Sequence, residues 1–442
     1  MTPSRPVSAT AGTAVPGDDT GIALPVGPGE LLSCGSGYLT RALRSYGTLA
    51  ADNAVANVTE FAEVGGGSTG RKARLSVEYA GRDPQLPTEL FAKFSRDLDD
   101  PVRDAGRTQM KAEVRFAELA RTPGFPITVP ATLFADYHSE SGTGLLISER
   151  IMFGDNGIEQ QHHKCLDYEM PDPLDHYRTV TVSLARLAGW HRSGAAGGAI
   201  DDFPVGLQAA SVGERRPLSE NRLARQLARL TDFTSTHPRL FPAGVRAPHF
   251  LSGFAEQVPM IARAEAAVWR HLAADPNHIA LCHWNANVDN AWFWRDADDV
   301  LQCGLMDWGC VSQMNVAMAL WGAMSAAETA LWNEHFDALV TLFVTELAAA
   351  GGPPIDPGEL TRQVLIYAGI MGVSWLLDVP ALISSRLGES ARAMTRYDAP
   401  IKHDASVRAP LQMLVNVLNL WQTRDIGALL AAFDNPRLRS GW

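Results

Sequence analysis

The densest group of polar side chains in the sequence lies in "LCHWNANVDNAWFW", residues 281–294. This stretch holds one His, three Asn, one Asp and three Trp, and apolar segments typical of strands flank it on both sides. Carboxamides and a carboxylate that crowd into a short loop between strands usually surround a charged group. The pattern predicts a functional loop, and it leaves open whether this loop does chemistry or only binds.

A second carboxylate closes an apolar segment shortly after that loop. Asp307 follows "LQCGLM" and precedes a Trp-Gly pair, which places it at a strand end beside a turn. If "NAWFW" and "LQCGLMD" form a hairpin, Asn290 and Asp307 meet at its open end. One amide oxygen and one carboxylate suit Mg²⁺, because they leave room for waters and phosphate oxygens. The alternative is that both residues only cap turns, and the pair alone does not decide between the two.

A lysine in the middle of an apolar segment is the third feature. Lys93 stands in "ELFAKFS", where its ammonium loses hydration unless a partner lies nearby. Glu113, on a predicted helix, can supply the opposite charge, whereas Glu118 on the same helix is turned away from it. A strand Lys paired with a helix Glu holds an ammonium where nucleotide phosphates bind. An edge-strand lysine that reaches solvent is the alternative.

The elements that must position these residues fall into two groups. Strand-like segments cover 57–64, 73–80, 88–95, 129–137 and 143–151, and apolar spacing predicts helices over 37–47 and 107–121. Further helices are predicted at 176–191, 219–231, 252–274, 316–350, 358–378 and 405–432, interrupted only within 279–308 by two short strands. The sequence therefore predicts an α+β fold with a small β-rich N-terminal lobe and a larger, mostly helical C-terminal lobe. Residues 1–28, rich in Pro, Gly, Ser, Thr and Ala, are expected to form a disordered arm.

Composition narrows the class of partner. The net charge of −11 over 442 residues argues against nucleic acid, whose phosphates attract basic surfaces. Five widely spaced cysteines without a CxxC pair fit a reducing cytoplasm. The N-terminus does not read as a secretory signal, and the longest apolar run, 316–327, falls short of the about 18 residues that a membrane span needs. We expect a soluble, cytoplasmic protein without a membrane partner, whose oligomeric state the sequence does not reveal.

Two adjacent histidines raise the question of another metal site. His162 and His163 stand in "EQQHHK", and we find no carboxylate or Cys partner at helical or ribbon spacing. A solvated loop is the expectation.

Taken in chain order, these features resemble the aminoglycoside phosphotransferase and choline kinase-like superfamily, and within it the ecdysteroid kinase-like branch. The resemblance covers about 58–325. "HWNANVDN" and "LMDWG" look like the family's His-Gly-Asp-x-x-x-x-Asn loop and Ile-Asp-Phe/Trp turn, and "KAEVRFAELA" looks like the helix that carries the ion-pair Glu. The resemblance implies a protein-kinase-like fold with an N-lobe over 29–151 and a C-lobe over 152–442.

The resemblance also implies roles for the matched residues. Those that would bind the phosphates of ATP are Gly65, Gly66, Gly67, Ser68, Thr69 and Lys93, the last of them paired with Glu113. Those that would form the interlobe hinge and receive adenine through backbone groups are Glu149, Arg150 and Ile151. In the catalytic loop His283 would brace the backbone, and Asn290 and Asp307 would hold Mg²⁺.

The catalytic loop departs from the family pattern at two positions. Asn285 stands where the family has the catalytic Asp, and Trp284 stands where it usually has Gly. In kinases that Asp accepts the proton of the acceptor hydroxyl, whereas an amide oxygen is a weak, neutral acceptor. Loss of such a base typically removes about 10²–10⁴-fold in rate. Asp289 adjoins Asn290 and is expected to point elsewhere, and Trp284 either fills the acceptor pocket or packs under the loop.

Three functions remain. The first is an ATP- and Mg²⁺-dependent phosphotransferase that acts on a hydroxyl of a small molecule. The second is a catalytically impaired relative that binds nucleotide or metabolite and acts as a regulator. The third is transfer of another part of ATP, such as a nucleotidyl group. The acceptor stays unnamed, because the helices after about 190 and 315 that would form its pocket are the variable part of such folds.

Overall fold

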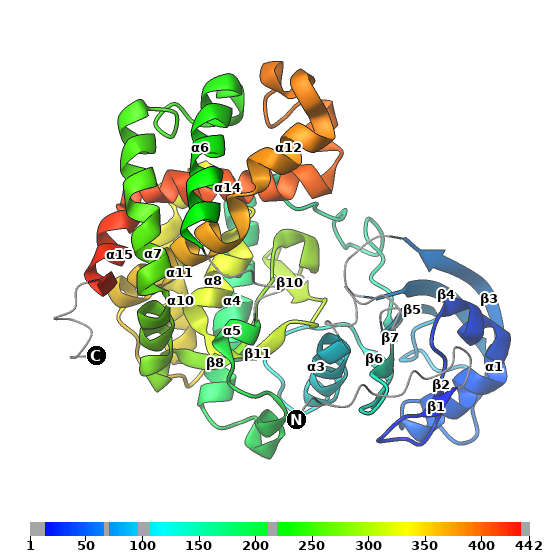
Figure 1. Ribbon diagram of the computed structural model, residues 1–442. Helices are drawn as coiled ribbons and strands as arrows, with labels where there is room; N and C mark the ends of the chain where they lie inside the picture. Colours follow the sequence, from blue (N-terminus) through cyan, green and yellow to red (C-terminus); the bar gives the residue numbers. More distant parts are fainter. Residues whose placement is uncertain (1–13, 66–69, 96–106, 211–218, 435–442) are drawn as a thin grey trace, which may run out of the picture. The chain divides into compact units, whose positions relative to one another are not determined.

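The chain divides into two compact units. The computed structural model describes residues 14–65, 70–95, 107–210 and 219–434. One unit comprises the chain up to Met152 together with Met306–Val311, and the other comprises Phe153–Leu305 with the chain from Ser312. Strands predominate in the first unit and helices in the second (Figure 1). The predicted α+β class is confirmed, but the six residues that carry Asp307 pack with the first unit rather than with their chain neighbours.

A five-stranded antiparallel sheet forms the centre of the first unit. Its strands, in spatial order, are β3 (Val55–Val64), β4 (Lys72–Tyr79), β5 (Glu89–Phe94), β7 (Thr143–Glu149) and β6 (Thr132–His138). Between β5 and β6 the chain forms α3 (Arg107–Leu119). All five strands and this helix were predicted, because period-two alternation and a helical apolar stripe distinguish them clearly.

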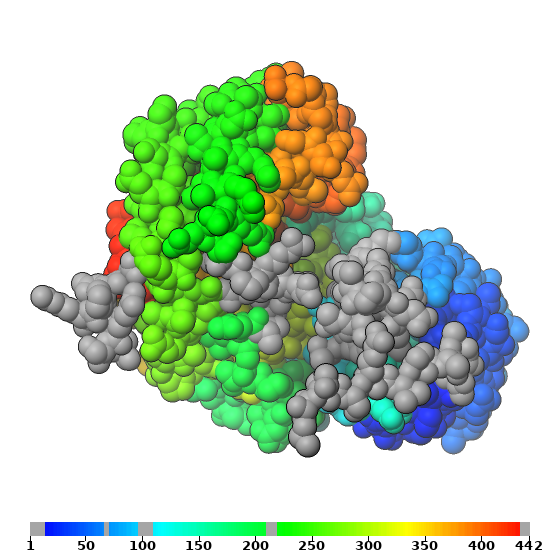
Figure 2. Space-filling view, viewed as in Figure 1, coloured from blue at the N-terminus to red at the C-terminus, as the bar shows by residue number. Residues whose placement is uncertain are grey.

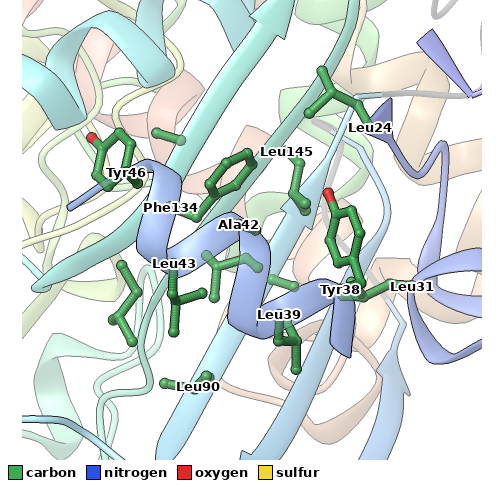
Figure 3. Packing of buried hydrophobic residues seen from close by; sticks show 14 of the residues in the cluster. Leu24, Leu31, Tyr38, Leu39, Ala42, Leu43, Tyr46, Leu90, Phe134 and Leu145 are labelled. Atoms are coloured by element: carbon green, nitrogen blue, oxygen red, sulfur yellow. The ribbon is translucent and has the colours of Figure 1, made fainter. Parts of the chain in front are cut away.

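Helix α1 (Pro28–Ser45) buries one apolar face against this sheet. The contact residues of α1 repeat at helical spacing, and those of the sheet come from β5, β6 and β7. As Figure 3 shows, Tyr38, Leu39, Ala42 and Leu43 face Leu90, Phe134 and Leu145. Every one of these side chains is at most 4% exposed. At about 1.5–3 kcal/mol for each fully buried large aliphatic or aromatic side chain, this layer stabilises the sheet that carries Lys93.

The N-terminal arm differs from its prediction over its described part. Strands β1 (Val15–Pro16) and β2 (Ala23–Leu24) pair with each other, and Asp18 N donates to Tyr137 O at 2.9 Å. The fully buried carboxylate of Asp136 accepts hydrogen bonds from the backbone N–H groups of Asp19 and Thr20. Backbone donors that satisfy a buried carboxylate attach the arm, a contact that composition could not reveal. Residues 1–13 lie outside the described residues.

The second unit is mostly helical. Its helices are α4 (Pro173–Arg192), α5 (Leu207–Ala210), α6 (Glu220–Thr236), α7 (Pro248–Ala274), α8 (Val316–Met324), α9 (Thr329–Glu334), α10 (Phe336–Ala349), α11 (Pro357–Met371), α12 (Val379–Leu387), α13 (Ala399–Lys402), α14 (Ala405–Arg424) and α15 (Ile426–Asp434). Helix α6 (green) packs against α7 (green) on one side and α12 (orange) on the other, on the face shown in Figure 2. None of the described helices could cross a membrane alone; the bent pair Pro357–Leu376 and Val379–Ala393 meets the length and composition criteria only when taken together.

Two short ladders interrupt these helices. The predicted hairpin is confirmed as β9 (Ala291–Arg295) paired with β10 (Leu301–Leu305), with Ala291 opposite Leu305. Strand β8 (Ile279–His283) pairs with β11 (Val311–Asn315). The sequence "VSQMN" of β11 was not predicted as a strand, because it lacks both β-branched enrichment and clean alternation.

The predicted helix over 316–350 is wrong, because the chain breaks twice and forms α8, α9 and α10. At the first break Asn416 Nδ2 of α14 donates to the carbonyl oxygens of Ser325 and Ala327, and Gln412 Nε2 donates to Ala327 as well. These side chains satisfy the orphan carbonyls at the end of α8, so the helix stops at no loss of hydrogen bonding. The stretch 405–432 also divides in two, at Asp425, whose φ of 49° is left-handed.

Candidate functional site

Lys93 lies on a central strand of the first unit and is buried. In the sheet its neighbours are Lys72 on β4 and Leu146 on β7, and its side chain is 6% exposed. The alternative of an edge-strand lysine that reaches solvent is therefore wrong. A buried ammonium on an interior strand requires charged partners.

The carboxylates of Glu113 and Asp307 are the charged partners of Lys93. Lys93 Nζ lies 2.5 Å from Glu113 Oε2 of α3 and 2.7 Å from Asp307 Oδ1. Burial by itself would lower the pKa of Lys93, but the carboxylates of Glu113 and Asp307 outweigh it and hold that pKa above its ordinary value. The predicted pairing with Glu113 is confirmed, and Glu118 pairs instead with Arg115 at 3.0 Å. The contact between Lys93 and Asp307 was not predicted.

The backbone around Asp307 holds its carboxylate near α3. Asp307 has a φ of 66°, a left-handed conformation that Asp tolerates better than most residues. The next residue, Trp308, stacks on Phe116 of α3 with ring centroids 3.7 Å apart and planes inclined by 15°. Because Trp308 is only 4% exposed, this stack fixes the turn to the helix. The Asp307 side chain keeps 34% of its surface exposed, so its carboxylate can meet a ligand.

The other residues predicted to bind nucleotide are only partly described. Gly65 is exposed after β3, whereas Gly66, Gly67, Ser68 and Thr69 lie outside the described residues. In the predicted hinge, Arg150 N donates to Glu89 O at 2.9 Å, and Glu149 Oε1 accepts from Ala131 N at 3.0 Å. The amide hydrogen of Arg150 thus extends the sheet. The nucleotide-binding roles of these residues stay predictions.

In the second unit, the loop between β8 and β9 is held by its own amides. His283 is fully buried, and its Nδ1 accepts from Asn285 N at 3.1 Å, while its role in bracing a catalytic loop stays a prediction. Asn290 Nδ2 donates to Asn285 O at 2.8 Å, and Asn290 N donates to Asn287 O at 2.8 Å. At the other end, Leu281 N of β8 donates to His191 Nδ1 of α4 at 3.1 Å. The loop is a closed network that fixes the direction of each amide.

Asn285 has two further partners, one of which the sequence did not indicate. Its Oδ1 accepts from Asn287 Nδ2 at 2.7 Å and from Lys164 Nζ at 3.3 Å. Lys164 Nζ also lies 3.8 Å from Asp289 Oδ1, and its backbone carbonyl accepts from Arg408 Nε. Lys164 is distant in sequence, at 121 residues from Asn285, and no spacing pattern connects the two. The loop therefore carries an ammonium beside the position where the family places a carboxylate.

Trp284 contacts helices α11 and α8, and both of its predicted placements stay predictions. Its indole Nε1 donates to Tyr367 OH of α11 at 2.8 Å. Its carbonyl oxygen lies against Gly322 of α8, where an added Cβ would come within 1.6 Å of it. A glycine in the middle of α8 therefore allows the loop to approach this helix.

The expectation of a solvated loop at His162 is wrong. His162 Nε2 lies 2.8 Å from Glu159 Oε2, and the same oxygen lies 2.8 Å from His176 Nε2 of α4. The side chain of His162 is 13% exposed and that of His176 is 2% exposed. Residue spacing does not predict this cluster, because Glu159 and His162 lie in an irregular segment and His176 lies in a helix.

The second unit contains a cavity of about 450 Å³, lined in part by residues that follow Lys164 in the chain. Its walls come from 167–175 and from 328–335. At its edge Asp167 is 1% exposed, and its Oδ2 accepts from Tyr177 OH and from Glu328 N. Burial raises the pKa of Asp167 to about 7, in spite of these two hydrogen bonds, so this carboxyl holds its proton far above its ordinary range.

Comparisons with known proteins give structural likeness and no sequence match. No protein-family model matches the chain, and no curated protein sequence does. The ethanolamine kinase of Plasmodium vivax is 12% identical over 88% of this chain and 89% of its own, with a TM-score of 0.41. The choline kinase of Cryptosporidium parvum is 11% identical over 85% and 93%, with a TM-score of 0.41.

A third neighbour is a spectinomycin phosphotransferase solved in complex with ADP and spectinomycin. It is 8% identical over 86% of this chain and 94% of its own, with a TM-score of 0.38. The ecdysteroid kinase-like branch stays a prediction.

Proposed function

We propose that the protein is an ATP- and Mg²⁺-dependent phosphotransferase whose acceptor is a hydroxyl group of a small molecule. The observation that carries the proposal is the buried ammonium of Lys93 between Glu113 and Asp307. Glu113 fixes the lysine to α3, while Asp307 is the more exposed of its two partners. The phosphates of ATP can take the place of Asp307 beside Lys93, which frees the carboxylate for a metal ion.

The residues predicted to hold Mg²⁺ fit that ion by their chemistry. The amide nitrogen of Asn290 donates to Asn285 O, which leaves the amide oxygen as the coordinating atom. Asp307 adds a partly exposed carboxylate, so both ligands are hard oxygen donors of the kind that Mg²⁺ prefers. When bound, the ion neutralises charge on the phosphate oxygens. Asn290 and Asp307 flank the paired residues Ala291 and Leu305 along the chain, and their joint role stays a proposal.

Activation of the acceptor must proceed without a carboxylate at position 285. The Oδ1 of Asn285 already accepts from Asn287 and Lys164 and is a poor base. Phosphoryl transfer depends mainly on positioning and on charge neutralisation, because its transition state is loose. We propose that Lys164 supplies positive charge beside the loop and that Asn285 holds Lys164 in place. Turnover is then slow and depends little on general-base catalysis.

A second function is favoured by the same contacts. Because the oxygen of Asn285 is engaged on both sides, the loop could hold nucleotide or metabolite without transfer. The protein would then act as a regulator. Transfer of a nucleotidyl group is the remaining alternative, and the product distinguishes it.

Calorimetric titration with ATP and Mg²⁺ tests the proposal first. We expect millimolar affinity or better in the native protein and a loss of at least about tenfold in Lys93→Met, because the ammonium contacts the phosphates. Lys111→Met, which removes an exposed lysine from the same helix as Glu113, is the matched control and should bind as the native protein does. Absence of binding in the native protein would overturn the proposal together with nucleotidyl transfer from ATP.

The product is identified next by mass spectrometry of a metabolite extract incubated with ATP, Mg²⁺ and protein. A gain of phosphate on a hydroxyl compound supports the phosphotransferase, and a gain of AMP supports nucleotidyl transfer. ATP binding with no modified product in the native protein or in Asn285→Asp supports the regulator.

A further inference from the structure

The contacts among Glu159, His162 and His176 point to a site that the proposed function does not use. Glu159 and His162 lie in the irregular segment after β7, and His176 lies in the first turn of α4. Their ligand atoms, one carboxylate oxygen and two imidazole nitrogens, all lie within 4.8 Å of one another. All three residues belong to the second unit.

The orientation of His176 shows that acceptor atoms converge. Its Nδ1 lies 3.1 Å from Asp172 O, and because a carbonyl oxygen only accepts, Nδ1 carries the hydrogen. The lone pair of the neutral imidazole is then on Nε2, which faces the carboxylate oxygen of Glu159 at 2.8 Å. Two acceptor atoms at this distance repel each other unless a proton on Nε2 or a metal ion lies between them. Metal-binding histidines usually donate their second ring nitrogen to a carbonyl or carboxylate, as His176 does.

We infer that Glu159, His162 and His176 bind a divalent transition-metal ion of the zinc class. Two imidazole nitrogens and one carboxylate oxygen suit Zn²⁺, whereas Mg²⁺ and Ca²⁺ prefer oxygen ligands throughout. Bond lengths of about 2.0–2.2 Å in a tetrahedron separate ligand atoms by about 3.4 Å. The present separations of 2.8 Å therefore need to widen by about half an ångström, within reach of side-chain rotation. Three protein ligands leave the fourth position to water.

The surroundings hold the three ligands in place. Glu159 N donates to Phe293 O of β9 at 2.8 Å, and the neighbouring residue Ile158 bridges to Trp294. The ring of Phe293 packs against His176 and His162, with centroids 4.6 and 5.7 Å away. An aromatic wall limits access of water, and the backbone contacts fix the segment to β9.

The position of the site gives the ion a structural role. It joins the segment 159–162 to α4, and the same segment continues to Lys164, whose ammonium contacts Asn285 in the loop. Bound metal would therefore fix the stretch of chain that presents Lys164. Binding to the native state alone raises the free energy of unfolding with the logarithm of ligand concentration, once that concentration exceeds the dissociation constant.

Titration of chelator-treated protein with Co²⁺ and Zn²⁺ tests the inference. We expect one Co²⁺ per chain with the visible absorption of a tetrahedral site, displacement by Zn²⁺, and a rise in melting temperature with either ion. His162→Ala, which alters a partly exposed residue, should weaken binding at least about 100-fold, since even outer contacts to such ligands contribute about 10–100-fold. His163→Ala removes the exposed adjacent histidine and is the matched control, which should bind as the native protein does.

Glu159→Gln serves as a second variant, because it keeps the size of the side chain if His162→Ala disturbs folding. It should also weaken binding, with circular dichroism unchanged. Native protein that binds Co²⁺ and Zn²⁺ no more tightly than a His162→Ala/His176→Ala double variant would overturn the inference. So would equal losses in His162→Ala and His163→Ala, since either result means that the cluster shares protons only.

Discussion

One buried carboxyl group in each unit, Glu113 in the first and Asp167 in the second, is stabilised in a different way. In the first unit Glu113 faces the ammonium of Lys93, and both residues are almost fully buried. In the second unit Asp167 is as deeply buried, but its hydrogen bonds come from a hydroxyl and a backbone N–H, and burial raises its pKa to about 7. The first arrangement keeps charges in place to act on a ligand, and the second removes the charge. The loop between β8 and β9 resembles the second arrangement, because an uncharged amide stands at position 285.

The largest effect is expected from removal of the buried ammonium. Lys93→Met leaves Glu113 and Asp307 close together without a positive partner, which should lower the free energy of unfolding by about 3–5 kcal/mol. Urea denaturation measures the change.

The double variant Lys93→Met/Glu113→Leu sharpens that result. It replaces the pair with apolar side chains, so it should recover most of the lost stability, because buried ion pairs are often replaceable by apolar residues. Equal destabilisation in the single and double variants would mean that lost packing, and not unpaired charge, dominates.

A comparable effect is expected from pH at Asp167. The unfolded carboxyl ionises near its ordinary pKa of 3.8, whereas the folded one keeps its proton up to about 7. The folded state therefore binds more protons between these values, and the free energy of unfolding falls as pH rises from about 4 to 7, by up to about 4 kcal/mol. Asp167→Asn should remove this part of the slope in urea titrations taken at several pH values.

Whereas Asp167→Asn removes the titration of this carboxyl, Tyr177→Phe should raise its pKa further. The hydroxyl of Tyr177 lowers the pKa of Asp167, so its removal should extend the pH-dependent loss to higher pH. Identical pH profiles for the native protein and Asp167→Asn would show that this carboxyl is not held neutral.

An intermediate effect is expected where the loop meets α8. In Gly322→Ala the new Cβ would come within 1.6 Å of Trp284 O, which forces the loop or the helix to shift at about 1–3 kcal/mol. Gly253→Ala in α7 is the matched control, because nothing lies within 4 Å of its added Cβ. That control should be neutral or slightly stabilising. Similar urea midpoints for both variants would contradict the close approach.

The smallest effect, and the most specific, is expected from Asn285→Asp. This change gives the loop a carboxylate next to Lys164 and moves it toward the charged pattern of the first unit. If the amide is a weakened base, the turnover number should rise at least about tenfold, which is less than the full effect of about 10²–10⁴-fold of a general base. A fall in turnover, with ATP affinity unchanged, would show that the amide itself holds the acceptor or Lys164.

The sequence predicted the elements with clear periodicity and the contacts that follow from them. The sheet strands, α3 and the pairing of Lys93 with Glu113 were all expected, because a charge on an apolar strand requires a partner on the adjoining helix. The break between α8 and α9 was not, since distant Asn416 satisfies the carbonyls of Ser325 and Ala327 there. The contact of Lys164 with Asn285 was missed for a similar reason, and so was the contact of Glu159 with His162 and His176. They join segments without regular spacing, and only tertiary structure brings them together.

The six residues Met306–Val311 have a consequence for how this chain can be divided. They belong by contact to the first unit, although nearly the whole of their sequence surroundings belongs to the second. A fragment that stops at residue 152 would lack the aromatic stack on Phe116 and one counter-ion of Lys93. Grafting the strand-rich part of a relative onto this protein would therefore require exchange of two separate stretches of gene, because recombination at one crossover would separate the buried lysine from the residue that supplies one of its two counter-ions.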